Sequence, residues 1–215
     1  MLNVLLANLP LLLKGAVVTL YLSAASAALA AVIGVAVALL QLYGDPVTRA
    51  AAHVYLYVMR GVPLLVLLFA MYYMLPYTGI DVGATAGGII VIALYFGAFM
   101  AEVFRAAILS VPRGQWDAAR ALGMYGRLLM LIVVVPQALR IAGPPFVNTC
   151  IMLVKGTSLV SIVGLWEVTM AGRQIVERTL APFQVFGGVA AVYFVICYCL
   201  SRYGRWLEKR VSYVH

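Results

Sequence analysis

The residues best suited to recognising another molecule form one polar stretch, residues 113–124, near the middle of an otherwise apolar chain. In a helix, Arg113, Asp117 and Arg120 fall at positions i, i+4 and i+7, so their charges share one face. A charged face of this kind can form ion pairs with another molecule, and through such a contact a partner can exert force on a membrane protein. On charge alone, a solvated loop at the inner membrane surface accounts for the same residues.

The chain carries no signature of catalysis or of a bound cofactor. It has no Gly-x4-Gly-Lys-Ser/Thr phosphate loop, so it cannot hold ATP by that route, and energy must come from a partner or an ion gradient. Cys150, Cys197 and Cys199 lie in apolar segments with no CxxC pair and no histidine nearby, which argues against a metal site or disulfide framework. We therefore name no catalytic residue, no metal site and no cofactor on this chain.

The composition is typical of a polytopic membrane protein. Of the 215 residues, 65% are hydrophobic and 10% are charged, whereas a soluble domain is roughly half apolar and a quarter charged. The net charge of +8 comes from basic residues scattered among apolar segments, so we attribute it to membrane topology rather than to nucleic-acid binding. The apolar N-terminus has no basic region and no clear cleavage site, so we do not expect a removed signal peptide.

Five segments are apolar enough to cross a bilayer, which takes about 20 residues each. An odd number of spans places the termini on opposite sides. We predict an all-α, polytopic transmembrane helical bundle in which residues 1–215 form one domain, with a long connection at about 107–141. The five predicted spans are residues 15–42, 54–76, 84–106, 142–164 and 182–203.

The distribution of Lys and Arg predicts the orientation, because basic connections favour the cytoplasmic side. Eight of these residues lie in connections on one side and three on the other. The 107–141 connection and the C-terminus are therefore predicted to be cytoplasmic, and the N-terminus to be outside. The eight are Arg49, Arg113, Arg120, Arg127, Arg140, Arg205, Lys209 and Arg210, and the three are Lys14, Arg173 and Arg178.

Local signals divide the 107–141 connection. Ser110 and Pro112 are typical of a helix start, and Gly123 is typical of a helix stop, which predicts a short helix over about 114–122. Residues 128–135 are apolar but too short to span the bilayer, so we place them at the inner membrane surface.

Small residues mark places where helix backbones can approach closely. In the first span, Ala30, Gly34 and Ala38 recur every four residues, and residues 83–88 are rich in glycine. We favour packing within the bundle over a specific dimer seam. The fourth span opens with Gly143, Pro144 and Pro145 and later contains the Lys-Gly-Thr-Ser segment at residues 155–158, so it is predicted to be interrupted, as backbone beside a substrate pathway often is.

The spacing around residue 117 resembles the signature of the membrane-spanning permease subunits of ATP-binding-cassette importers, in the polar amino-acid uptake family. That signature reads Glu-Ala-Ala, three residues, Gly, nine residues, then Ile-x-Leu-Pro. The chain has the same spacing with conservative replacements. The matching residues are Asp117, Ala118, Ala119, Gly123, Val133, Val135 and Pro136.

Flanking segments extend this resemblance over nearly the whole chain. Residues 60–66 resemble the family's Arg-Gly-Thr-Pro-Leu-Leu-Val, residues 113–115 read Arg-Gly-Gln, and residues 155–159 resemble Lys-Asp-Thr-Ser-Leu. Two departures occur. Gly156 stands where the family commonly has Asp, and Val62 and Leu67 replace polar residues that are common in the second span.

The resemblance implies a type I importer permease in a bacterial inner membrane, working by alternating access on polar or charged amino acids. Its short cytoplasmic helix would dock on a separate ATPase subunit that binds ATP and Mg. A second permease chain, identical or paralogous, and an external substrate-binding protein would complete the assembly. Ala118 and Ala119 would allow close approach, and Gly123 would permit the turn. The implied coupling residues are Arg113, Gly114, Gln115, Asp117, Ala118, Ala119, Gly123 and Pro136.

Lys155 is the most conspicuous charge in the predicted spans. It lies about 20 Å into the fourth span at 1.5 Å per residue, where an unpaired charge is costly. It either contacts a substrate carboxylate or a buried acid or tunes a gate, or it forms a structural pair with another helix or a backbone carbonyl, and we leave both roles open. Thr157, Ser158 and Ser161 could bind an amino acid, although bonds to their own helix are favoured.

Two further groups of charges have structural alternatives. The outer segment with Glu167, Arg173, Glu177 and Arg178 is a candidate contact for the binding protein or a solvated face. Glu102 is best paired with Arg105, three residues along the same helix.

Two other classes of protein compete with the importer permease. An ion-coupled secondary transporter or channel subunit needs no ATPase, but gives no reason for the 113–136 signature, and five spans are few for a transporter acting alone. A structural membrane subunit without a pathway gives no reason for Lys155.

Overall fold

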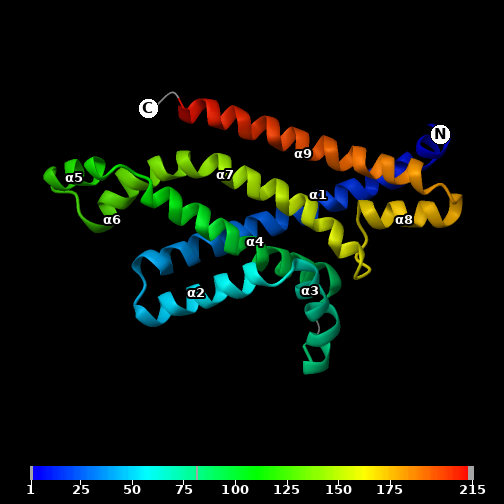
Figure 1. The fold of residues 1–215 in the computed structure, drawn as a ribbon, viewed down its shortest axis with the longest axis horizontal. Helices are drawn as coiled ribbons and strands as arrows, with labels where there is room; N and C mark the ends of the chain where they lie inside the picture. Colours follow the sequence, from blue (N-terminus) through cyan, green and yellow to red (C-terminus); the bar gives the residue numbers. More distant parts are fainter. Residues whose placement is uncertain (1, 81, 213–215) are drawn as a thin grey trace.

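The computed structural model describes residues 2–80 and 82–212, and every regular element in these ranges is a helix (Figure 1). The long helices lie side by side along the longest axis of the molecule. The N-terminus and α8 lie at one end, and the α1–α2 turn and α5 lie at the other. The α-helices are α1 (Leu2–Tyr43), α2 (Pro46–Gly61), α3 (Leu64–Phe69), α4 (Ala84–Leu109), α5 (Arg113–Ala121), α6 (Gly126–Leu129), α7 (Val135–Gly156), α8 (Val168–Thr179) and α9 (Pro182–Ser212).

The predicted bundle is confirmed. Among the described residues, four helices are long and apolar enough to cross a membrane, and a bent pair makes a fifth candidate. The predicted spans at 84–106 and 182–203 fall inside α4 and α9. The predicted first span is contained in α1, but α1 begins earlier, at Leu2, and is about 63 Å long at 1.5 Å per residue. Its early turns are held by Leu12, which packs with Val185 and Val189 of α9.

The predicted second span is not one straight helix. Helix α2 and the segment Leu64–Thr78 meet at an angle of 103°. Pro63 has no N–H to continue the ladder and disfavours helical backbone at the residue before it. Val62 is accordingly extended, with φ −98° and ψ 132°. The average hydropathy of 54–76 conceals this break.

Helix α2 starts at a well-formed cap in the α1–α2 turn, outside the apolar spans. The Asp45 carboxylate accepts from the Val47 and Thr48 N–H groups at 2.8 and 3.0 Å. The bond from the Thr48 amide, above all, lowers the pKa of the exposed Asp45 carboxyl from its ordinary value. The O–H of Tyr55 donates to the Leu94 carbonyl of α4 at 2.6 Å, which ties α2 to the bundle.

The segment 128–135, predicted to lie at the inner membrane surface and to lead into the fourth span, forms the first turns of a continuous 36-residue helical run, Gly126–Ser161. Residues Met130–Val134 form a π-helical turn, in which the Val135 N–H donates to the Met130 carbonyl. This wider turn precedes Pro136, whose ring would collide with the carbonyl four residues earlier in a regular helix.

The fourth span is irregular at the second of its two predicted places, residues 155–158, and not at the first. Pro144 and Pro145 lie inside α7 without interrupting it. The regular helix ends at Gly156 and tightens into a 3-10 helix over Thr157–Ser161. Gly164, with φ +85°, then turns the chain toward α8. The irregular backbone therefore lies at the α8 end of the span.

The small residues of α1 pack within the bundle, as predicted. Ala30 and Ala38 are buried, and a Cβ placed on Gly34 would lie 2.8 Å from the Met100 Cβ of α4. Helices α1 and α4 share the main buried cluster, which includes Leu22, Ala30, Ile92 and Met100. Glycine at residue 34 thus sets how closely these two helices approach.

We predict that Gly34→Val destabilises the protein by about 1–3 kcal/mol, because the added carbons must push α1 and α4 apart. The measurement is the thermal unfolding midpoint in detergent. Gly187→Val in α9 is the matched control, since nothing lies within 4 Å of a Cβ there. An unchanged midpoint for Gly34→Val would show that this contact does not set the helix spacing.

Candidate functional site

Helix α5 is the short helix that the polar stretch predicted. It runs from Arg113 to Ala121, within a residue of the prediction. The N–H of Gly123 donates to the Arg120 carbonyl at 2.9 Å, and that of Met124 donates to the Ala119 carbonyl at 3.0 Å. These two bonds form a Schellman motif, which requires a left-handed residue at Gly123. Its φ is +79°.

One face of α5 is fixed to the body of the protein. Ala119 is 3% exposed and packs in a cluster with Val111, Leu129 and Val134. The indole N–H of Trp116 donates to the Val111 carbonyl at 3.3 Å. The expectation that Ala119 approaches a partner is therefore wrong, because its methyl group faces its own chain.

The opposite face of α5 is exposed. Arg113, Gly114, Gln115, Asp117, Ala118 and Arg120 are all on the surface, and so are Gly123 and Pro136 beyond the helix. The Arg120 guanidinium lies 3.2 Å from the Asp117 carboxylate, as expected for residues on one face. A groove of about 530 Å³ lies beside this pair and is also lined by Arg113 and Trp116. Ala118, a small exposed residue at the centre, leaves room for another surface.

Sequence reasoning missed two exposed apolar side chains next to this face. Leu122 is 77% exposed and Tyr125 is 68% exposed. Leu122 lies directly before Gly123 and Tyr125 two residues after it, and these positions next to the turn could have indicated them. Together with the charged face they give α5 both polar and apolar groups for a contact. The amide of Gln137 in α7 reaches Gln115 at 3.4 Å, which links this face to the long span.

Lys155 lies near the end of α7, beside the 3-10 turn, and not at the middle of its span. Its side chain is exposed and makes no hydrogen bond or ion pair with any described residue. The hydroxyls that follow bond their own helix, as favoured: Thr157 to the Val154 carbonyl, Ser158 to that of Lys155, and Ser161 to that of Ser158, at 2.7–2.8 Å.

Glu167 is not part of an exposed face, contrary to expectation. It is 0% exposed and caps α8 by accepting from the Thr169 and Met170 N–H groups at 2.8 and 3.0 Å. Its second oxygen accepts from the O–H of Thr19 in α1 at 3.2 Å and of Tyr193 in α9 at 2.8 Å. A buried carboxylate with these four partners joins three helices.

The other charges of this segment do lie on the surface. Arg173, Glu177 and Arg178 are exposed along α8. Arg173 also reaches the Ser161 carbonyl at 3.4 Å, which connects α8 to the 3-10 turn after Lys155. Helix α8 lies at the end of the molecule that carries the N-terminus, away from α5 (Figure 1).

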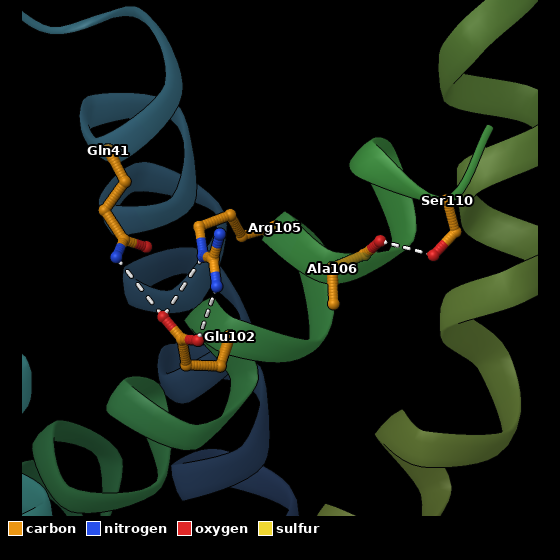
Figure 2. A network of polar contacts seen from close by, with 5 residues as sticks. All are labelled: Gln41, Glu102, Arg105, Ala106 and Ser110. Atoms are coloured by element: carbon orange, nitrogen blue, oxygen red, sulfur yellow. Dashed lines mark hydrogen bonds and ion pairs between the residues drawn. The ribbon is translucent and has the colours of Figure 1, made fainter. Parts of the chain in front are cut away.

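A polar cavity of about 740 Å³ lies between α1, α2 and α4 and was not predicted. Figure 2 shows three of the residues that line it, with Gln41 and Arg105 converging on Glu102. The predicted Arg105–Glu102 ion pair is present at 2.9 Å, and the Gln41 amide donates to the same carboxylate at 3.2 Å. Arg60 also lines the cavity, with its guanidinium carbon 5.6 Å from the centre of the Phe99 ring.

The helical bundle and the exposed α5 define a membrane-spanning subunit with a surface for another protein. Residues 30–213 match the family model described as "Binding-protein-dependent transport system inner membrane component". The chain belongs to this family, so it is a multi-pass inner-membrane subunit of a transport system and not itself an enzyme.

Individual relatives agree with this assignment. The chain is 34% identical over 206 residues to the probable amino-acid ABC transporter permease protein YckA of Bacillus subtilis, covering 96% of this chain and 91% of that protein. It is 32% identical over 206 residues to the glutamine transport system permease protein GlnP of Escherichia coli, covering 95% and 94%. These relatives do not favour an ion-coupled transporter or a channel.

Solved structures show the same fold. A crystal structure of an amino acid ABC transporter with histidines matches with a TM-score of 0.90 and 31% identity, over 96% of each chain. The inward-facing MetNI methionine ABC transporter matches with a TM-score of 0.79 and 22% identity, over 94% of this chain and 96% of that one, which supports the fold alone.

Proposed function

We propose that this chain is the transmembrane permease subunit of an ATP-driven importer for polar or charged amino acids. The observation that carries the proposal is α5, a capped helix whose exposed face holds the Asp117 signature at the end of an apolar bundle. The names of the relatives support the substrate class, since they include amino-acid and glutamine permeases. Residues 1–215 would act as one transmembrane domain.

The coupling partner would be a separate ATPase subunit that binds ATP and Mg. Arg113, Asp117 and Arg120 would set the register of α5 in a groove on that subunit, and exposed Ala118 would allow close approach. A movement of α5 would be transmitted to α7 through the contact between Gln115 and Gln137. A second permease chain, identical or paralogous, would complete the pathway for alternating access.

The orientation follows from the same assignment. Helix α5 and the α1–α2 turn, at one end of the molecule, would face the cytoplasm together with the C-terminus, and the N-terminus would face outside (Figure 1). Basic residues at the α5 end support this orientation. The exposed charges of α8, Arg173, Glu177 and Arg178, would then face an external substrate-binding protein.

Lys155 would act near the outer end of the pathway, where its ammonium group lacks an ion-pair partner among the described residues. We predict that Lys155→Ala lowers uptake of an amino acid by reconstituted transporter, because the substrate carboxylate loses an attractive charge. Lys155→Arg, which keeps the charge, should retain more activity. Uptake kinetics unchanged by Lys155→Ala would limit this residue to a structural role.

Co-purification from the native membrane tests the proposed function. The tagged chain should bring down a stoichiometric ATPase subunit, and the hydrolysis rate of that complex should rise when the loaded binding protein is added. Ala118→Arg should reduce recovery of the ATPase, because a long charged side chain would occupy the centre of the exposed face. Recovery of the chain without any ATPase would contradict the assignment.

A further inference from the structure

A groove of about 470 Å³ lies between α1, α7 and α9, where these three helices contact one another. Its walls are almost entirely apolar, and several of the side chains that line it are small: Ala24 and Ala27 of α1, Cys150 of α7 and Cys199 of α9. Small side chains on facing helices leave a hollow that no described side chain fills. Because Ala24 and Cys199 are exposed, the hollow opens onto the outer surface of the described chain.

The groove lies in the part of the chain that crosses the membrane. The helices that form it are three of the four long enough and apolar enough to span a bilayer. An empty hollow leaves the atoms of its lining without packing contacts on one side, and a flexible hydrocarbon chain restores those contacts. The groove extends from Leu20 to Ala27, about 10 Å along α1 at 1.5 Å per residue. It therefore has the shape and the chemistry to hold a lipid tail.

A second observation indicates the chemistry at the other end of the occupant. Val195, Cys199 and Arg202 fall at positions i, i+4 and i+7 of α9, so they share one face, and the first two line the groove. Arg202 lies about 4.5 Å beyond Cys199 along the helix axis, at 1.5 Å per residue. Its side chain is exposed and makes no hydrogen bond or ion pair with a described residue. The guanidinium therefore has N–H donors without acceptors, and a phosphate group accepts from them well.

The position of Arg202 along α9 agrees with the level of a lipid headgroup. From Pro182, where α9 begins, to Arg202 the helix is about 30 Å long, which is the thickness of the hydrocarbon core of a bilayer. The stacked rings of Tyr203 and Trp206 follow directly, and aromatic residues of this kind gather at the headgroup level. A lipid whose tail occupies the groove would thus place its phosphate beside Arg202.

We propose that the groove between α1, α7 and α9 binds one tail of an anionic phospholipid whose phosphate contacts the guanidinium of Arg202. Arg205 and Lys209 are exposed near the same end of α9, and Glu208 is the one acid of this helix. The excess of positive charge favours an anionic headgroup over a zwitterionic one. A second permease chain would also cover the groove, but one lipid molecule both fills the hollow and supplies the anion. The site does not depend on which solute the chain transports.

Lipid titration of the intact assembly tests this site. The chain is purified in detergent with the subunits bound to it, stripped of lipid, and titrated with phosphatidylglycerol or phosphatidylcholine that carry the same tails. Native mass spectrometry measures the lipid bound. We expect phosphatidylglycerol to bind at least about fivefold more tightly than phosphatidylcholine. Phosphatidylglycerol with shorter tails should bind more weakly, because it fills less of the groove.

Two variants separate the headgroup contact from the tail contact. Arg202→Gln should weaken phosphatidylglycerol about fivefold and leave phosphatidylcholine nearly unchanged. Ala24→Leu should weaken both lipids and remove the advantage of longer tails, because the added carbons occupy the groove. Two matched controls should bind both lipids as the wild type does. They are Arg49→Gln, whose guanidinium donates to the Gly44 carbonyl in the α1–α2 turn, and Ala36→Leu, which is exposed on α1 outside the groove.

The proposal is overturned if the wild type shows no preference for phosphatidylglycerol, or if either Arg202→Gln or Ala24→Leu binds it as the wild type does. The same spectra give the number of copies of this chain in the assembly. Loss of a second copy in Ala24→Leu, with phosphatidylglycerol binding intact, would assign the groove to an interface between permease chains and overturn the lipid site.

Discussion

Gly123→Val is expected to lower ATP-driven uptake about tenfold while leaving the protein in the membrane. Gly123 has φ +79° and closes the Schellman motif of α5. A β-branched residue in this region costs about 1–2 kcal/mol, and 1.4 kcal/mol corresponds to a tenfold change in an equilibrium. Nothing lies within 4 Å of a Cβ at this position, so the effect comes from the backbone alone.

The measurement is uptake per ATP hydrolysed in proteoliposomes that contain the whole transporter. Gly123→Asn is the control, because asparagine tolerates left-handed backbone, and it should keep most of the uptake. If valine supported the same uptake per ATP as glycine, the geometry of the α5 turn would not contribute to coupling.

Glu167→Ala is expected to produce the largest loss of stability of any single change considered. The carboxylate accepts from two backbone N–H groups of α8 and from Thr19 and Tyr193. Each buried partner left without an acceptor costs about 1–3 kcal/mol. Because these partners belong to α1, α8 and α9, their loss should release α8 from the bundle.

Thermal unfolding in detergent and protease sensitivity around Thr179 measure this effect. Glu167→Gln should have an intermediate stability, since its one oxygen can still cap α8 while its amide can donate to the Thr19 or Tyr193 oxygen. A Glu167→Ala protein that unfolds at the wild-type temperature would show that the carboxylate does not hold these helices together.

The features that were predicted correctly are those that depend on residues close together in the sequence. The capped helix α5 follows from Pro112 and Gly123, and the Arg105–Glu102 pair follows from helical spacing. The Ala30, Gly34 and Ala38 stripe identified the close contact of α1 without naming α4 as its partner.

The features that sequence reasoning missed depend on distant contacts or on backbone irregularity. Gln41 and Glu102 are 61 residues apart and meet only because α1 and α4 pack together, so the polar cavity was not predictable from spacing. Glu167 was expected on an exposed face, because nothing in its neighbouring sequence indicates that the fold places Thr19 and Tyr193 around it. The break at Pro63 was hidden by its apolar neighbours.

This chain should move an amino acid only when an ATPase acts on α5. Uptake by proteoliposomes with the purified chain and its permease partner, loaded binding protein outside and ATP with Mg inside, tests it directly. We expect accumulation only when the ATPase subunit is included, and we expect Ala118→Arg to abolish it. Accumulation driven by an ion gradient, with no ATPase present, would contradict ATP-driven transport by this chain.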